Sequence, residues 1–155
     1  MTRNKGFTLV EILIVVIILG ILAAIVIPQF SQASNDARES ALASDLQTLR
    51  SQLELYNIQH LDRYPDRTSA DNGVTWTQDT DGDNFKARLT ATTDEYSNSP
   101  GNFGPYMQNF PTNAFNSLDT VRIDGAAAGA GTEGWHFASA TGRMSPDDNL
   151  THAGL

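Results

Sequence analysis

The chain has 155 residues, a formal net charge of −8 and no cysteine. The absence of cysteine excludes disulfides and thiolate metal sites. The acidic balance argues against nucleic acid as a partner, because neutralising phosphates requires clustered lysine and arginine. The length is that of one domain.

An apolar run over residues 7–27 dominates the N-terminal part and contains one charge, Glu11. A helix rises about 1.5 Å per residue, so the run is about 30 Å long, the thickness of the hydrocarbon core of a bilayer. Arg3 and Lys5 precede the run, and no basic residue follows until Arg38. This asymmetry predicts a cytoplasmic N-terminus and a remainder that lies on the other side of the membrane.

Glu11 does not fit a plain anchor, because a carboxylate in an apolar span is poorly solvated and indicates a function by default. Cutting the chain between Gly6 and Phe7 would leave an ammonium on Phe7 within helical reach of Glu11, in the same chain or a neighbour. The alternative is that Glu11 only marks the interfacial end of the helix. A secretory signal peptide is disfavoured, because the run is too long and the small pair Ala23-Ala24 is followed by more apolar residues.

The stretch Gly6-Phe7-Thr8-Leu9-Val10-Glu11, with the apolar run and Pro28 after it, resembles the class III signal of type IV prepilins and of the pseudopilins of type II secretion systems. The resemblance implies that residues 1–6 are a leader, which a prepilin peptidase removes after Gly6. It also implies methylation of the new Phe7 amine, and docking of each subunit onto its neighbour through Glu11.

The type of pseudopilin that this chain most resembles is the major one, of the general secretion pathway protein G type. The resemblance implies a structural subunit rather than an enzyme. Its partners would be further copies of itself in a helical homopolymer, the peptidase, an inner-membrane assembly platform and minor pseudopilins. The subunit would cross the bacterial inner membrane once, with its C-terminal domain in the periplasm, and would drive protein export across the outer membrane. The alternatives are a type IV pilin for adhesion, motility or DNA uptake, which the missing cysteines disfavour, and a monomeric membrane-anchored binding protein.

Two helix-weakening residues, Gly20 and Pro28, lie in the first segment. Glycine costs about 1 kcal/mol and proline about 3 kcal/mol in a helix interior. Because residues 31–65 again read as a helix, we expect Pro28 to kink the helix rather than end it. The resemblance implies that the stretch between the two residues can unwind in a filament.

Beyond residue 31 the helix becomes amphipathic. Leucines and one tyrosine recur at spacings of three and four, which predicts one buried helix face, at Leu42, Leu46, Leu49, Leu53 and Tyr56. The pattern predicts a helix continuing to about Leu61 and ended by the stretch around Pro65.

The remainder predicts a small β-rich domain over residues 66–155. Val121–Asp124 alternates like an edge strand, and the stretches at 135–138 and 142–144 suit a hairpin. Residues 86–90 fit either a strand or a helical turn, and the tail from Ser145 reads as loosely docked. The predicted fold class is α+β, with a leader at 1–6, a membrane and filament-core helix at 7–30, an amphipathic continuation at 31–65, and a small antiparallel sheet packed on the C-terminal half of the helix.

The stretch with Asp79, Asp81 and Asp83 invites a calcium interpretation, because carboxylates at alternate positions can converge on a hard cation. Major pseudopilins, as the resemblance implies, use a calcium-stabilised loop. Against an EF-hand loop, glycine stands fourth rather than sixth and Thr90 stands at the twelfth position. A solvated acidic turn is therefore the favoured interpretation. Further aspartates that could supply ligands from other loops are Asp119, Asp124, Asp147 and Asp148. No nucleophile elbow, P-loop or dinucleotide fingerprint supports an enzyme.

Overall fold

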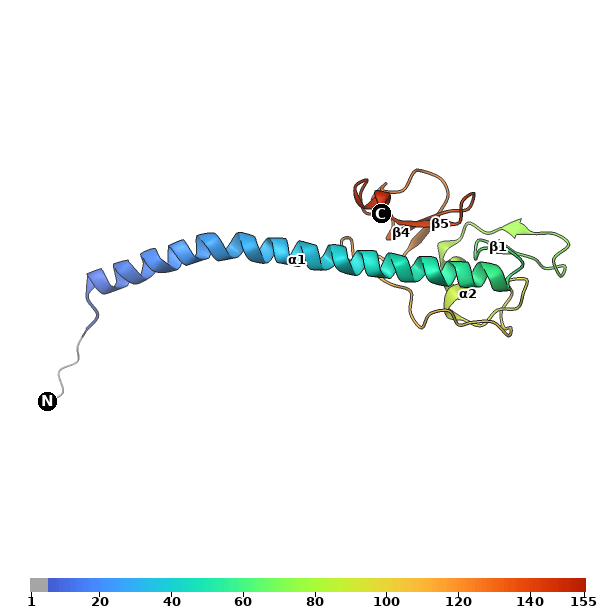
Figure 1. Ribbon diagram of the computed structural model, residues 1–155, viewed down its shortest axis with the longest axis horizontal. Helices are drawn as coiled ribbons and strands as arrows, with labels where there is room; N and C mark the ends of the chain where they lie inside the picture. The colour runs from blue at the N-terminus through green and yellow to red at the C-terminus, as the bar shows by residue number, and fades with distance from the viewer. Residues whose placement is uncertain (1–5) are drawn as a thin grey trace. The chain divides into compact units, whose positions relative to one another are not determined.

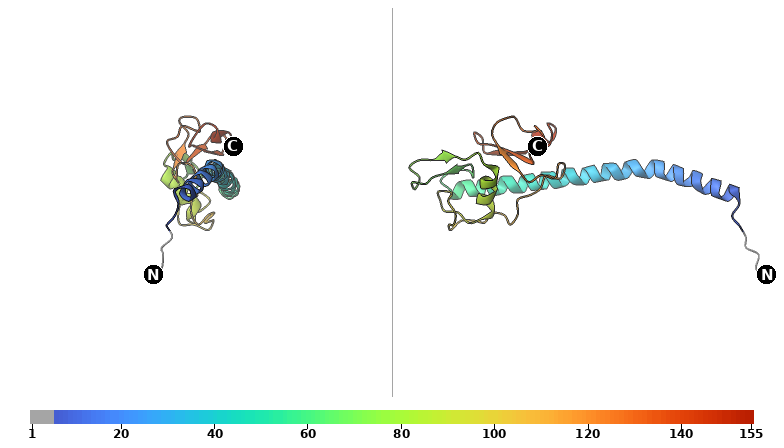
Figure 2. Two further views of the ribbon diagram at one scale, coloured as in Figure 1. Left: turned by 90° about the vertical axis from the view of Figure 1, so that its left-hand side faces the viewer. Right: turned by 180° about the vertical axis from the view of Figure 1, so that it is seen from behind.

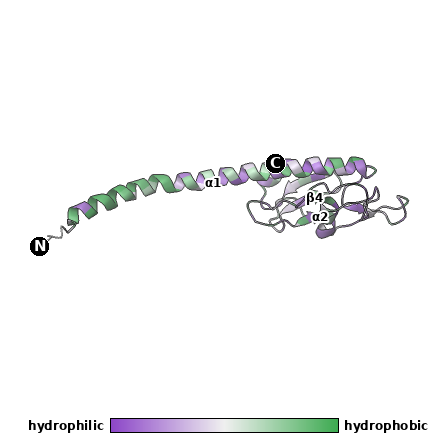
Figure 3. Ribbon diagram, turned by 90° about the horizontal axis from the view of Figure 1, so that it is seen from below, coloured by the Kyte–Doolittle hydropathy of each residue, from purple (hydrophilic) through white to green (hydrophobic). Residues whose placement is uncertain are grey.

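The computed structural model describes residues 6–155, so all of the leader before Gly6 lies outside the described residues. Contacts between residues divide the chain into two units, one ending at Arg38 and the other spanning Glu39–Leu155. Helix α1 (Leu9–Gln59) contributes to both units. Up to Ile27 it is apolar apart from Glu11, whereas polar and apolar residues are mixed along the rest of the helix (Figure 3).

Helix α1 continues through Pro28, so this proline does not end it, as predicted. The helix ends at Gln59, slightly before the expected end near Leu61. Leu61 and Asp62 adopt left-handed backbone angles, with φ of 56° and 58°, and the Asp62 N–H donates to the Asn57 carbonyl at 3.0 Å. This closes the helix as a glycine C-cap normally would. No glycine marks the position, which is why the sequence placed the end elsewhere.

The second unit contains two small sheets, one short α-helix and one 3₁₀ helix around the C-terminal part of α1 (Figures 1 and 2). The first sheet is an antiparallel pair, and the second has the strand order β3-β4-β5. The elements are β1 (Arg67–Thr68), β2 (Thr77–Gln78), α2 (Gly82–Thr90), β3 (Val121–Ile123), β4 (Trp135–Ala138), β5 (Arg143–Pro146) and the 3₁₀ helix η1 (His152–Gly154). The α+β class and the long N-terminal helix are therefore confirmed.

The predicted hairpin and edge strand are present, since β4 pairs antiparallel with β5 and β3 lies at the edge of its sheet. One pairing differs from the expectation. Strand β3 runs parallel to β4, with Val121 opposite Trp135, so the sheet is mixed. The ambiguous stretch at 86–90 belongs to α2, which is stabilised at its start by the Asp81 side chain accepting from the Asp83 N–H.

The apolar core lies entirely within the second unit. The predicted stripe on α1 is buried throughout and packs with residues from α2 and the three-stranded sheet, as confirmed by the exposed fractions of the side chains. The core consists of Leu42, Leu46, Leu49, Leu53, Tyr56, Phe85, Leu89, Val121, Ile123, Trp135, Phe137 and Met144.

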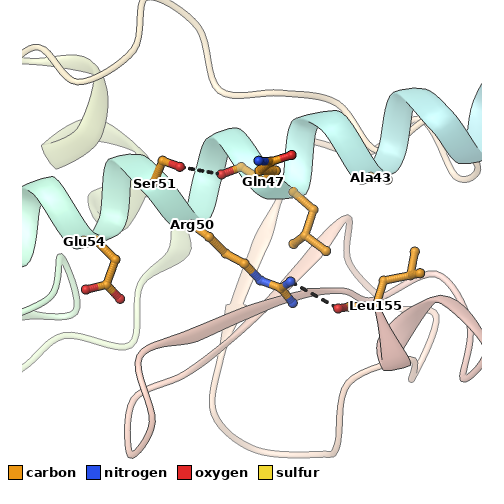
Figure 4. Close-up of a pocket in the computed structure, with 7 residues that line it drawn as sticks. Ala43, Gln47, Arg50, Ser51, Glu54 and Leu155 are labelled. Carbon is orange, nitrogen blue, oxygen red and sulfur yellow. Dashed lines mark hydrogen bonds between the residues drawn. The ribbon is translucent and has the colours of Figure 1, made fainter.

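The end of the chain is more firmly docked than the sequence indicated. Ser145 and Pro146 belong to β5, and Asp147 is fully buried. Arg50 of α1 donates to the Met144 carbonyl through Nε and Nη2, at 3.1 and 2.9 Å. It also donates through Nη1 to the Leu155 carbonyl at 3.1 Å (Figure 4). Hydrogen bonds from the Arg50 side chain thus hold a tail that the sequence predicted to be loosely docked.

Candidate processing and assembly site

Glu11 forms a reciprocal capping arrangement with Thr8 at the start of α1. The Thr8 N–H and the Thr8 hydroxyl each donate to Glu11 Oε2 at 2.8 Å, and the Glu11 N–H donates to Thr8 Oγ1 at 3.3 Å. This is the capping box, in which two otherwise unpaired N–H groups of a helix start are satisfied. The sequence interpretation missed Thr8, although threonine three residues before glutamate is the signature of this motif.

Gly6 and Phe7 precede the first residue of α1 and are exposed, with 85% of Phe7 accessible. Among the described residues, no heavy atom lies within 4 Å of a Cβ built on Gly6, so residues 7–155 do not cover this backbone. The described structure contains the intact Gly6–Phe7 bond, and in this form the Glu11 carboxylate accepts from Thr8. Any approach of a Phe7 ammonium to Glu11 would follow cleavage of the bond.

The large apolar side chains from Phe7 to Phe30 are 40–85% exposed in the single chain. By length and composition, α1 is sufficient to cross a membrane, and its most apolar window has no buried residue. Gly20 lies in the apolar part of α1, and no heavy atom of the described residues lies within 4 Å of a Cβ built on it. The segment therefore presents apolar surface that the rest of the described chain does not cover.

The three aspartates of the candidate calcium stretch have separate partners. Asp79 accepts from the Asp81 N–H at 3.0 Å and from Arg88 Nη2 at 2.7 Å, Asp81 caps α2, and Asp83 pairs with Lys86 at 3.2 Å. Burial raises the pKa of Asp79, but the Asp81 amide and Arg88 outweigh it and hold that pKa below its usual value. Within residues 6–155, no group of three or more His, Cys, Asp or Glu side chains is placed to hold a metal ion.

The other four aspartates considered as ligands are also engaged elsewhere. Asp119 pairs with Lys86, Asp124 accepts from Gln78 and from the Ser139 N–H, Asp147 pairs with Arg122, and Asp148 lies 2.6 Å from His152 Nδ1. Asp83 and Asp119 thus share Lys86, and the other aspartates each bind different groups, so within residues 6–155 they do not gather into a metal site.

Comparison with known proteins identifies the N-terminal segment. Residues 1–27 match the family described as the prokaryotic N-terminal methylation motif. Type II secretion system core protein G of Dickeya chrysanthemi is 41% identical over 63 residues, which are 41% of this chain and 40% of that relative. Its counterpart in Klebsiella pneumoniae is 40% identical over 65 residues, 42% of this chain and 46% of the relative.

The type IV major pilin protein PilA of Myxococcus xanthus is 42% identical over 64 residues, covering 41% of this chain and 29% of that pilin. The chain thus spans less than half the length of these curated relatives. No solved structure matches it. The resemblance to prepilins and pseudopilins, and to the core protein G type among them, is confirmed. The relatives named here are secretion and pilus components, and none of them bears the name of an enzyme.

Proposed function

We propose that this protein is a structural subunit of a type II secretion pseudopilus, anchored in the inner membrane before assembly. The observation that carries the proposal is the match of residues 1–27 to the methylation motif, in a segment whose apolar side chains are uncovered in the single chain. The similarity to type II secretion system core protein G supports the secretion filament specifically.

The apolar half of α1 has two environments that can cover it. In the membrane, lipid surrounds it, because apolar helices of this length match the hydrocarbon core. In a filament, copies of the same helix pack together and replace the lipid. Arg3 and Lys5 favour a cytoplasmic N-terminus, which leaves the second unit in the periplasm.

Processing would act at the exposed Gly6–Phe7 bond. Cleavage by a prepilin peptidase creates an ammonium on Phe7, and Glu11 supplies a carboxylate on the next turn of the helix. In an apolar surrounding an unpaired carboxylate is costly, so an incoming subunit gains free energy when a neighbour's Phe7 amine reaches Glu11. Assembly would then drive export across the outer membrane.

The processing step is tested by intact mass and N-terminal sequencing of the membrane-purified protein, with and without the peptidase. A chain that begins at a methylated Phe7 only when the peptidase is present supports the proposal. A chain that still begins at Met1, or that is cut after the apolar run, contradicts it and favours an anchor or a secreted domain.

The assembly step predicts that Glu11→Ala is processed normally but forms few or no filaments, because the docking carboxylate is gone. Filament yield is measured by electron microscopy and by cross-linking with an amine-reactive reagent, since the chain has no cysteine. Glu39→Ala is the matched control, since Glu39 is an exposed glutamate farther along α1. Normal filaments from Glu11→Ala would remove the proposed role.

A type IV pilin is the second candidate, because the Myxococcus xanthus major pilin shares 42% identity over a similar length. Deleting the gene separates the two. Loss of secreted enzymes from the medium with intact twitching motility supports the secretion filament, whereas loss of motility with intact secretion supports the pilus.

A further inference from the structure

Residues 124–134 connect the parallel strands β3 and β4, and they form no apolar core of their own. It is composed mainly of glycine and alanine and contains no large apolar side chain. Parallel strands require a crossover connection, which is usually a helix that packs on the sheet. This crossover has no helix, and most of its residues from Gly125 to Thr132 are exposed. Its conformation must therefore depend on polar contacts.

Arg122 supplies the first half of these contacts from β3. Its guanidinium donates through Nη1 to the Asp124 carbonyl at 2.8 Å and to the Ala126 carbonyl, and through Nη2 to the Ala127 carbonyl at 3.1 Å. The same group donates to both carboxylate oxygens of Asp147, at 2.7 Å from Nη2 and 3.2 Å from Nε. A single guanidinium is thus surrounded by main-chain carbonyls and one carboxylate.

Asp147 supplies the second half, from the residue that follows β5. Its side chain is fully buried, and besides Arg122 it accepts from the N–H groups of Gly129 and Ala130, at 2.9 and 3.1 Å. The Thr132 hydroxyl lies 3.4 Å from its second oxygen, and the Gly131 N–H donates to the Asp147 carbonyl at 2.6 Å. The two halves of the crossover are therefore bound to opposite members of one ion pair.

We propose that the Arg122 guanidinium is the cation around which the 124–134 crossover folds, so that this connection takes its shape without a bound divalent cation. Three carbonyl oxygens and a carboxylate are the oxygen donors that a hard cation attracts, and here a side chain that is always charged occupies them. The planar fork of arginine reaches several acceptors at once, which the single ammonium of lysine does not. A carboxylate buried as completely as Asp147 requires such a partner.

The first test uses the unaltered full chain in detergent micelles and measures amide hydrogen exchange with calcium present and with the metal chelated. We expect the Gly129, Ala130 and Gly131 amides to exchange at the same rate in both conditions. Chelation that speeds their exchange would overturn the proposal, and this comparison requires no variant to fold.

The second test compares Arg122→Met with Arg143→Met, which removes an exposed arginine from β5 of the same sheet. We expect Arg122→Met to speed exchange at the crossover amides by about tenfold or more, because local opening then no longer breaks an ion pair. Exchange within β4 should stay slow in both variants. Unchanged crossover exchange in Arg122→Met, or an equal effect of Arg143→Met, would contradict the assignment.

A chemical rescue separates the charge of Arg122 from its bulk. Arg122→Ala leaves the oxygen cage without its cation, so free guanidinium at millimolar concentration, far below the denaturing molar range, should restore slow exchange at Gly129 and Ala130. The same addition should not rescue Arg122→Ala when Asp147→Asn is also present. Failure of guanidinium to rescue the single variant would reduce Arg122 to a packing role and overturn the proposal.

Discussion

His60 lies fully buried immediately beyond the last turn of α1, where its ring is fixed on both edges. Nδ1 is 2.8 Å from the Tyr56 carbonyl, and Nε2 is 2.9 Å from the Thr93 hydroxyl oxygen. The ring stacks on Tyr56 with centroids 3.7 Å apart. A carbonyl only accepts, so Nδ1 carries the proton, and Nε2 of the neutral ring accepts from Thr93. The residue thus connects the end of the helix to the loop after α2 in its uncharged form.

This environment makes stability depend on pH. Burial lowers the pKa of His60 from its ordinary value of 6.5, and the contacts with Tyr56 and Asp94 only partly offset this. The unfolded chain therefore binds the proton more readily than the folded chain, so stability is complete above the unfolded pKa and decreases as the pH falls below it. Each unit of difference in pKa corresponds to about 1.4 kcal/mol.

We expect the free energy of unfolding in urea to decrease between about pH 7 and about pH 5, and to decrease less in His60→Gln than in the wild type. His136→Gln is the control, since burial and Arg122 also lower the pKa of His136. That variant should keep the part of the pH dependence that belongs to His60. An identical pH dependence in the wild type and His60→Gln would show that His60 is not the titrating group.

A residue and its partner could be predicted from the sequence only when the two lie close together along the chain. Glu11 was identified because a charge in an apolar run is conspicuous. Its partner in the described structure, Thr8, was also readable, because the spacing of the capping box is local. The Arg122–Asp147 pair was not readable, because 25 positions separate its members and two strand pairings, β3 with β4 and β4 with β5, are needed to bring them together.

Helix α2 illustrates how one element fixes another. Its first residue, Gly82, faces the backbone of β3 so closely that an added Cβ would lie 2.0 Å from the Val121 carbonyl oxygen. Only a residue without a side chain permits this approach. The Phe85 and Leu89 side chains, one turn farther and two turns farther along, then enter the core.

Gly82→Ala should therefore destabilise the second unit by about 2 kcal/mol or more, in the range of overpacked cores, because backbone rather than a flexible side chain must move. Gly154→Ala is the matched control, since no heavy atom of residues 6–155 lies within 4 Å of a Cβ built there. Thermal or urea unfolding monitored by circular dichroism measures both. Equal stability of the two variants would show that α2 and β3 separate easily.

The elements differ in how clearly the sequence predicted them. The stripe on α1 was unambiguous because five buried positions repeat with helical spacing over four turns. In α2 only Phe85 and Leu89 mark the periodicity, so a strand fitted residues 86–90 equally well. The direction of β3 relative to β4 leaves no trace in alternation, since side chains alternate identically in parallel and antiparallel strands.

At the scale of the whole molecule, apolar residues are divided between two purposes. In the second unit many of them form one buried core, although others such as Ile58 and Val74 are exposed, whereas from Phe7 to Phe30 the large apolar side chains are all exposed in the single chain. The spacing of apolar residues along the sequence separates the two groups, because a continuous apolar run differs from a stripe in which apolar residues recur every three or four positions. This division implies that folding of the second unit and coverage of the first segment are independent events.

The independence predicts that a fragment of residues 31–155 is soluble without detergent, monomeric, and unfolds at nearly the same temperature as the second unit of the full chain in micelles. Every core residue from Leu42 to Met144 is present in this fragment. Leu49→Ala within it should cost about 2–5 kcal/mol, the usual range for a buried leucine, which verifies that the measured transition reports this core. Calorimetry and sedimentation test the prediction. An unfolded or aggregated fragment would instead mean that the first segment contributes to the fold of the second unit, and the apolar run could then not be treated as surface reserved for membrane and filament.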